Sequence, residues 1–403
     1  MQSLRSNRVV LSDEVRPATV RWEQGVVVEV EDGSADRDYG DLVVLPGLVD
    51  SHVHVNEPGR TDWEGFATAT RAAAAGGTTT IVDMPLNSVP PTTTVAALQE
   101  KRKVARGQLA VDVAFWGGIV PGSFGEIPGM VDAGVCGFKV FLTESGVPEF
   151  PLVEPGDLTG LSLDVPLLVH AEADEHLRKS GPSYAEYLES RPAAAEAAAI
   201  RQVGGLDTPV HILHVSSAEG VGAIASSPGV SGETCPHYLN FTAADVTGVE
   251  FKCAPPIREA EHREALWEGL KNGALSMVVS DHSPSPPAMK KGDFATAWGG
   301  IASLQLRLPA TWTGAADRDV GFAELARWLA LAPAELAGLD DRKGSIEVGK
   351  DADFVVFDPD GETVVSGRGL HHRHPMTPYE GMRLRGLVVD TLMGSSARML
   401  NRK

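Results

Sequence analysis

One pattern repeats eight times between Leu45 and Ser283. A short apolar run rich in β-branched residues stops at polar residues and is followed by a stretch of helix-like composition. The connecting stretches, such as WEGFATATRAAAAGG and RPAAAEAAAIRQVGG, are rich in helix-forming residues, and several close on glycine, as helix ends often do. Eight such units predict an α/β fold, a (β/α)8 barrel with its active site at the C-terminal ends of the strands. The apolar runs are residues 45–55, 78–86, 111–120, 135–142, 165–172, 209–217, 230–239 and 275–283.

The two ends of the chain do not follow this repeat. Short strand-like runs occur before it, in RWEQGVVVEV and DLVVL, and after it, in GSIEVGKDADFVVFDP and LRGLVVDTLMG. We therefore expect residues 1–44 and 344–403 to form one small β domain together, of the β-sandwich type. The catalytic barrel would then span residues 45–343.

Composition narrows the range of partners. The 403 residues carry a net charge of −19, which disfavours nucleic acid and anionic membrane surfaces, because both need basic patches. The three cysteines, Cys136, Cys235 and Cys253, are widely spaced and support neither a disulfide framework nor a cysteine zinc site. No run approaches the ~20 apolar residues that cross a bilayer, and the first residues lack a secretory apolar segment. We expect a cytoplasmic protein that acts on a small molecule.

Polar side chains gather where the predicted strands end. His52 and His54 lie one residue apart, so alternation along a strand points both the same way. Taken singly, each of these residues has an ordinary explanation: a histidine bonded to the backbone, a lysine whose ammonium reaches water, or an aspartate that caps a helix. Together they would meet at one mouth of a barrel, and four imidazoles with a carboxylate suit zinc or a similar divalent ion. The residues are His52, His54, Lys139, His170, His214 and Asp281.

Lys139 is the exception in this set, because a protonated amine has no lone pair for a metal. It needs either a modification or a role away from the metal. At this point the chain resembles the amidohydrolase superfamily, in which a lysine at the fourth strand is carbamylated by carbon dioxide and bridges two metals. The order HxH, Lys, His, His, Asp matches over essentially the whole chain, including the β domain split between the ends. The resemblance implies two divalent ions, with zinc expected first and cobalt, manganese or nickel as alternatives. It also implies N6-carboxylysine at Lys139 and a homo-oligomer, expected as a homotetramer.

Within this superfamily, EPG, GGTTTIVDMPLN, ETCPHYL and KCAPPIR resemble the cyclic amidase branch of dihydroorotases, dihydropyrimidinases (hydantoinases) and allantoinases. Dihydroorotases generally have an arginine and a histidine, which anchor a substrate carboxylate, where this chain has Asn56 and Ser285. Without these cationic anchors, the carboxylate of such a substrate would lose its water and find no positively charged partner in the site. Hydantoinases usually have a tyrosine where this chain has Glu144. The segments NEPGRTDWEGF, DMPLNSVPPT, SDHSPSPPAMK and AWGGIASLQ resemble the allantoinases, although Ser285 departs from the cysteine often found there.

The resemblance also suggests substrate contacts. We expect Asn56, Asn87 and Ser285 to contact the substrate, although Asn87 also suits an ordinary turn before Pro90. We place His237 on the seventh strand, where it shapes the pocket or orients other groups without binding metal. Five further histidines are expected at the surface or in packing: His211, His262, His371, His372 and His374.

The implied reaction is hydrolysis of the cyclic amide bond of allantoin to allantoate, in the degradation of purines. A hydroxide held between the two metals would attack the ring carbonyl, and Asp281 would act as general base and then as general acid. A hydantoinase or dihydropyrimidinase activity is the alternative. A third possibility is a scaffold that has this architecture without catalysis, since a fold alone does not fix function.

Overall fold

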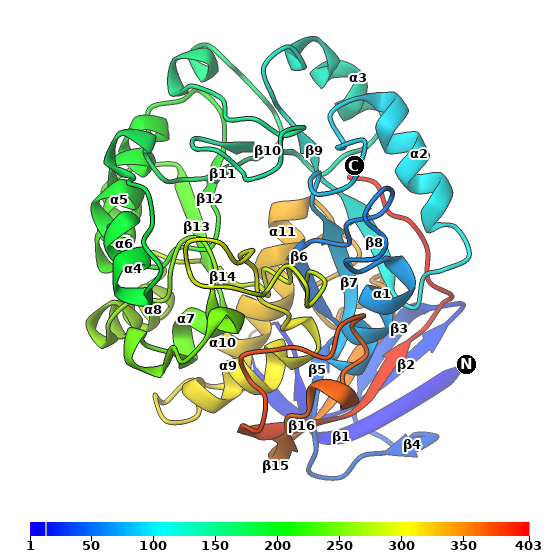
Figure 1. Ribbon diagram of the computed structural model, residues 1–403. Helices are drawn as coiled ribbons and strands as arrows, with labels where there is room; N and C mark the ends of the chain where they lie inside the picture. Colours follow the sequence, from blue (N-terminus) through cyan, green and yellow to red (C-terminus); the bar gives the residue numbers. More distant parts are fainter. Residues whose placement is uncertain (13, 403) are drawn as a thin grey trace.

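A computed structural model describes residues 1–12 and 14–402 (Figure 1). Its central feature is a ring of parallel strands in which the eight expected strand positions follow one another in chain order. The third position is split by Trp116 into two short strands. The strands are β6 (Leu48–Val53), β7 (Thr78–Asp83), β8 (Asp112–Phe115), β9 (Gly117–Gly118), β10 (Phe138–Phe141), β11 (Leu167–His170), β12 (Val210–Ile212), β13 (Val230–Thr234) and β14 (Met277–Val278).

The ring closes between its first and last strands. Val53 at the end of β6 forms a parallel bridge with His282, just beyond β14, and the His54 N–H donates to the His282 carbonyl over 2.8 Å. Nearly every residue of the barrel strands is buried, as the near-continuous apolar runs require for strands covered on both faces. The (β/α)8 fold expected from the sequence is confirmed.

Helices connect the strands and cover the ring. Figure 1 shows α2, α3, α5, α6 and α8 at its periphery. Local sequence sets their ends: the Thr94 hydroxyl caps α2 by accepting from the Ala97 N–H, and α8 stops at Gly273, whose φ of 82° is left-handed. The α-helices are α1 (Phe66–Ala75), α2 (Val95–Ala105), α3 (Ile127–Asp132), α4 (Tyr184–Ser190), α5 (Ala193–Val203), α6 (Ala218–Ala225), α7 (Pro236–Asn240), α8 (Ala260–Asn272), α9 (Arg307–Ala315), α10 (Phe322–Ala326) and α11 (Ala332–Ala337).

Shorter helical turns complete the connections. A π-helical turn spans Arg327–Leu331, between α10 and α11. The 3-10 turns are η1 (Phe124–Glu126), η2 (Pro155–Leu158), η3 (Asp174–His176), η4 (Ala243–Asp245), η5 (Val249–Phe251), η6 (Leu304–Leu306) and η8 (Gly367–Gly369). Across residues 1–12 and 14–402, no helix combines the length and apolar character needed to span a bilayer.

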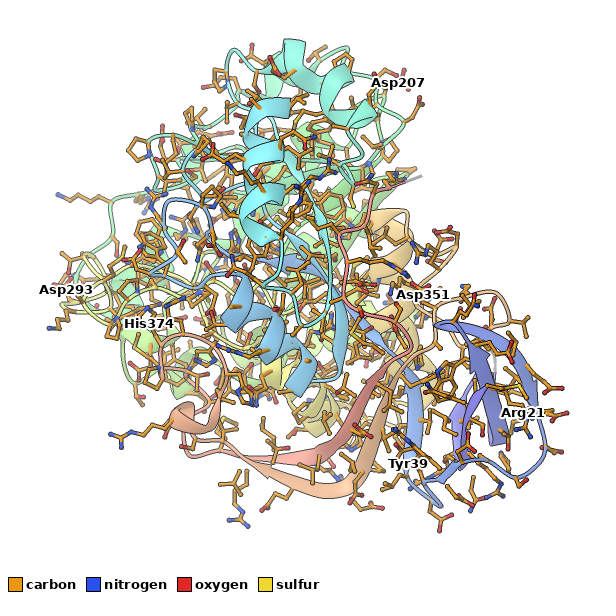
Figure 2. The ribbon with its side chains drawn as sticks, turned by 90° about the vertical axis from the view of Figure 1, so that its right-hand side faces the viewer. Arg21, Tyr39, Asp207, Asp293, Asp351 and His374 are labelled. Atoms are coloured by element: carbon orange, nitrogen blue, oxygen red, sulfur yellow. The ribbon has the colours of Figure 1, made fainter. Side chains whose placement is uncertain are left out.

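A second sheet joins the two ends of the chain. β5 pairs antiparallel with β15, with Pro46 opposite Phe354, so strands from both ends share one sheet, as expected. The order is β16-β15-β5-β1-β2-β3, with β4 beside β1. Figure 2 shows this sheet to one side of the barrel, with Arg21 and Tyr39 labelled on it. The strands are β1 (Gln2–Val10), β2 (Val15–Glu23), β3 (Val26–Glu31), β4 (Arg37–Asp38), β5 (Val43–Pro46), β15 (Asp353–Val364) and β16 (Arg383–Met393).

The division into domains at residues 44 and 344 stays a proposal. β5 straddles the first boundary, and β15 begins nine residues after the second.

Candidate metal centre

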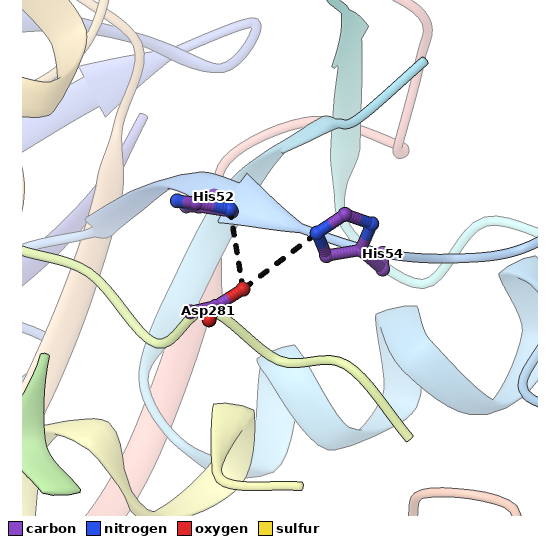
Figure 3. Close-up of side chains that lie close together, drawn as sticks. All are labelled: His52, His54 and Asp281. Atoms are coloured by element: carbon purple, nitrogen blue, oxygen red, sulfur yellow. Dashed lines mark ion pairs between the residues drawn. The ribbon is translucent and has the colours of Figure 1, made fainter. Parts of the chain in front are cut away.

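Two histidines and an aspartate meet where the first and last barrel strands end (Figure 3). His52 belongs to β6 and His54 follows it, and their ring centroids lie 5.5 Å apart on the same side of the strand. Asp281 follows β14, and its Oδ1 lies 3.2 Å from His52 Nε2 and 3.6 Å from His54 Nε2. The common face predicted from the spacing of the two histidines is therefore present.

The other three predicted residues approach the same place from neighbouring strands. His170 ends β11 and His214 follows β12, with His170 Nδ1 and His214 Nε2 2.9 Å apart. The rings of His52 and His214 have centroids 5.4 Å apart, and Lys139 lies buried in β10. Five of the six residues, all but His52, line one cavity of about 450 Å³. The structure thus brings the whole predicted set together.

Hydrogen-bond partners fix which nitrogen of three imidazoles is free. His52 Nδ1 lies 2.5 Å from a Glu233 carboxylate oxygen, and His54 Nδ1 lies 3.3 Å from the Leu86 carbonyl. His170 Nε2 lies 2.8 Å from a Glu172 carboxylate oxygen. Because these partners only accept, each of these nitrogens carries the proton, and the opposite nitrogen keeps a lone pair. In all three rings this lone pair faces the other members of the cluster.

Two of the cluster residues have unusual backbone conformations. His214 has φ 41° and Asp281 has φ 43°, both in the left-handed region that residues with a Cβ rarely adopt. Such strain persists only where the surrounding structure imposes it, and it concentrates at functional sites. The backbone therefore holds these two side chains in place at a cost in free energy.

Burial governs the ionisation of the cluster. It lowers the pKa of His52, His54 and His214 well below the ordinary imidazole range, with neighbouring positive groups adding to the effect. Burial also lowers the pKa of Lys139, against the attraction of Asp281 and Glu233, and raises the pKa of Asp281, against the attraction of Lys139. The imidazoles are thus neutral, in the form that binds a metal.

The donor set fits a divalent cation. Within the described part of the chain, His52 Nε2 and His214 Nδ1 are buried without a hydrogen-bond partner, and such polar atoms are costly unless another group satisfies them. Neutral imidazoles with a carboxylate are ligands that zinc and similar ions prefer. We conclude that this cluster is a divalent-metal site.

Carboxylates that sequence reasoning did not identify orient the histidines. Glu233 lies between His52 and His211, with its second oxygen 3.2 Å from His211 Nε2. The Glu172 carboxylate accepts hydrogen bonds from Arg191 Nε over 2.9 Å and from Arg191 Nη2 over 2.5 Å. Although burial opposes it, the charge of Arg191 and the bond to His170 hold the pKa of Glu172 below its usual range. The position of Glu172 two residues after His170 was a usable signal in the sequence, whereas Arg191 and Glu233 come from distant segments.

The three predicted substrate contacts differ in their positions. Asn87 lines the cavity, as a substrate contact must. Asn56 is buried beside it, where its Oδ1 accepts from Asn87 Nδ2 over 3.1 Å and its own Nδ2 lies 3.4 Å from the Pro284 carbonyl. Ser285 lines a separate, much smaller pocket, and its hydroxyl has no partner among the described residues. Of the three, Asn87 alone reaches the main cavity.

The structure also gives the positions of the other six histidines for which the sequence led to a prediction. His237 was expected on the seventh strand, but β13 ends at Thr234 and Pro236 starts α7, a helical position that suits proline. The His237 ring is fully buried near Cys235 and Asp281, and neither nitrogen has a hydrogen-bond partner among residues 1–12 and 14–402. His211 and His372 are buried, His262 and His374 are partly buried, and His371 is exposed.

Comparison with known proteins identifies the family of the chain. The pattern of the Amidohydrolase family matches residues 43–135 and 168–393. An allantoinase from Streptomyces avermitilis is 48% identical, with 96% of this chain and 93% of that protein covered. An allantoinase from Saccharomyces cerevisiae is 38% identical, with coverage of 98% and 94%.

Solved structures give the same answer for the fold. An L-hydantoinase (dihydropyrimidinase) from Arthrobacter aurescens superposes with a TM-score of 0.92 at 30% identity, and both chains are covered completely. The barrel, the cluster at its mouth and these relatives lead to one conclusion: the chain belongs to the amidohydrolase family.

Proposed function

We propose that this protein hydrolyses the cyclic amide bond of allantoin to give allantoate. The observation that carries the proposal is the convergence of His52, His54, His170, His214, Lys139 and Asp281 at one end of the barrel, around one cavity. Relatives named allantoinase, 38% to 48% identical over nearly the whole chain, support allantoin as the substrate.

The proposed ligand roles follow from the positions of the side chains. His52 and His54 would hold one ion through Nε2, together with Asp281, and His170 and His214 would hold a second. Lys139, carbamylated, would supply the carboxylate between them. Zinc is proposed as the ion, with cobalt, manganese or nickel as alternatives. The bound metal would supply an activated water and a Lewis acid for the ring carbonyl.

Asp281 carries the proton transfer in this proposal. Its carboxylate lies beside His52 and His54, at the wall of the cavity, where it can take a proton from the attacking water. The same carboxyl then gives the proton to the departing ring nitrogen, so one side chain serves as base and then as acid. Asn87 faces the cavity and can offer its amide to the ring.

Two alternatives to allantoin hydrolysis can be distinguished. The L-hydantoinase whose structure superposes so well favours a hydantoinase or dihydropyrimidinase activity. A non-catalytic scaffold would be expected to lack ligands, and here every ligand position is filled. A purified protein that binds no divalent metal, and that stays inactive after metal and bicarbonate are supplied, would favour the scaffold.

A panel of four cyclic amides tests the substrate. We expect kcat/KM to be highest for allantoin and lowest for dihydroorotate, because the residues at the Asn56 and Ser285 positions offer no positive charge for its carboxylate. Hydantoin and dihydrouracil complete the panel. If either is preferred, the hydantoinase alternative replaces allantoinase, and a preference for dihydroorotate refutes both.

The assembly is a separate proposal. A small-molecule substrate follows from the relatives, and we propose a homotetramer, which light scattering of the purified protein measures directly. The cytoplasmic location and the contacts of Asn56 and Ser285 with substrate stay predictions.

A further inference from the structure

The cavity of the metal centre contains a buried cation without an acidic partner. Lys252 lines this cavity, its side chain is largely buried, and within residues 1–12 and 14–402 no carboxylate forms an ion pair with it. Its Nζ donates to the Ala297 carbonyl over 2.6 Å and lies 5.1 Å from the centroid of the Tyr187 ring. An ammonium has three N–H donors, and this carbonyl takes one.

A neighbouring cation on the same wall makes the contrast clear. Arg191 also lines the cavity, but Glu172 neutralises it through two hydrogen bonds. Lys252 has no such carboxylate partner in the described ranges, and a largely buried ammonium without one is costly. Burial and then the charge of Arg191 lower the pKa of Lys252, opposed by Asp293. Lys252 follows the turn η5, whereas Lys139 lies in β10 and Asp281 follows β14, and all three side chains line one cavity.

This position suits the part of the substrate that does not react. Allantoin is a hydantoin ring that carries a ureido group, and the ring must lie at the metal centre for its carbonyl to be attacked. The ureido group then extends into the rest of the cavity, and its carbonyl oxygen is a strong acceptor for an ammonium. Resting on the proposed function, we propose that Lys252 binds the ureido oxygen of allantoin and so distinguishes it from rings without that group.

The chain offers a matched control. Lys290 is also largely buried, and it too has no carboxylate partner in the described ranges. Its Nζ donates to the Gly300 carbonyl over 2.5 Å, so Lys252 and Lys290 both bond to the segment 297–300. Lys290 lines the small neighbouring pocket and not the cavity of the metal centre. Lys252→Met and Lys290→Met therefore each remove one charge and one tether of this segment, but only the first removes a donor from the cavity.

The experiment compares wild type and both variants with two cyclic compounds, allantoin and hydantoin. Steady-state rates give kcat and KM for allantoin, and hydantoin is added as a competitor, so its binding is measured as an inhibition constant. Melting temperatures verify that each variant is folded. For Lys252→Met we expect kcat/KM for allantoin to fall about tenfold to a hundredfold, mainly through KM, as for the loss of a charged hydrogen bond. The inhibition constant of hydantoin, which has no ureido group, should change little, and Lys290→Met should change neither value much.

The outcomes separate this proposal from the proposed function. If wild type prefers allantoin but Lys252→Met weakens allantoin and hydantoin by the same factor, Lys252 only shapes the segment and the assignment is overturned. The assignment is also overturned if Lys290→Met reproduces the effect of Lys252→Met. If wild type does not hydrolyse allantoin at all, the proposed function fails, and the role of Lys252 fails with it.

Discussion

At the scale of single residues, Asp281 lies beside two imidazoles, and we propose that the same carboxylate also moves a proton. We expect Asp281→Asn to keep the fold while kcat falls by ~10² to 10⁴, the usual cost of losing a general acid-base group. An amide oxygen can still coordinate weakly but cannot shuttle a proton. Circular dichroism and steady-state kinetics measure the two effects. A variant that keeps a tenth or so of the wild-type rate would show that another group moves the proton.

Lys139 is proposed to act only as the carrier of a carboxylate. Lys139→Ala should therefore lose most activity and bind less metal, but regain part of the activity when short-chain carboxylic acids are supplied. The buried position of Lys139, in the cavity shared with His170 and His214, leaves room for such an acid after truncation. Metal content and rates with and without added acetate or propionate measure this. Full activity of the variant without any additive would contradict the carbamate assignment.

The sequence predicted the members of the cluster better than the groups around them. The proposed metal ligands stand at strand ends, so the order of the strands was enough to select His170 and Asp281. Glu233 and Arg191 act on those ligands from other segments, and only the folded chain brings them into contact. Asn56 comes two residues after His54 and has a left-handed backbone with φ 64°. Its amide is bonded to Asn87 and does not line the cavity.

At the scale of elements, Arg307 at the start of α9 holds together the first and last strands of the barrel. Its fully buried guanidinium donates to the Val49 carbonyl in β6 over 2.8 Å and contacts the Val278 carbonyl in β14 over 3.3 Å. Its Nε lies 3.5 Å from Asp50, whose carboxylate also accepts from the Ser280 N–H. The strand ends that carry His52 and Asp281 thus depend on one buried cation.

Replacing this cation should destabilise the protein strongly. We expect Arg307→Met to lower the free energy of unfolding by ~3 to 5 kcal/mol, because Asp50 is left as a buried charge without its partner. Arg383→Met is the control, since Arg383 pairs with Glu362 at the surface and such pairs contribute ~0 to 1 kcal/mol. Urea denaturation of both variants measures the difference. Equal losses would show that Arg307 does not support the barrel.

The elements themselves were largely predictable. Apolar runs that stop at polar residues gave all eight strand positions, because strands buried on both faces leave a continuous apolar signal. Details of hydrogen bonding were not predictable: β14 is only two residues long, and the third run divides into β8 and β9. His237 was misplaced because the apolar run continues past Thr234, while Pro236 starts a helix.

At the scale of the whole molecule, Lys343 connects the barrel to the sheet formed by the chain ends. Its buried ammonium lies 2.6 Å from Asp112 in β8, 2.6 Å from Asp353 in β15 and 2.9 Å from Asp351. Three acidic side chains at this spacing resemble a metal site, but here Lys343 lies between them, and Arg342 and Arg398 also pair with Asp351. Although burial opposes it, the three carboxylates raise the pKa of Lys343 above its ordinary value of 10.5.

The sign of this shift gives a pH prediction. A raised pKa means that the stabilisation is fully present below pH 10.5 and is lost as the pH rises through the higher pKa of the folded state. We expect Lys343→Met to be less stable than wild type at neutral pH, with a difference that stays constant up to about pH 10 and shrinks above it. Denaturant titrations across this range measure the difference. A gap that shrinks well below pH 10 would contradict the role of Lys343.

The central claim concerns the whole site: divalent metal bound by this cluster is required for hydrolysis of allantoin. The most direct measurement removes metal with a chelator, then adds zinc stepwise while the metal content per chain and the initial rate with allantoin are both recorded. The account predicts that activity disappears with the metal and returns in proportion to it, up to two ions per chain. A protein that contains no metal and still hydrolyses allantoin at its full rate would contradict it.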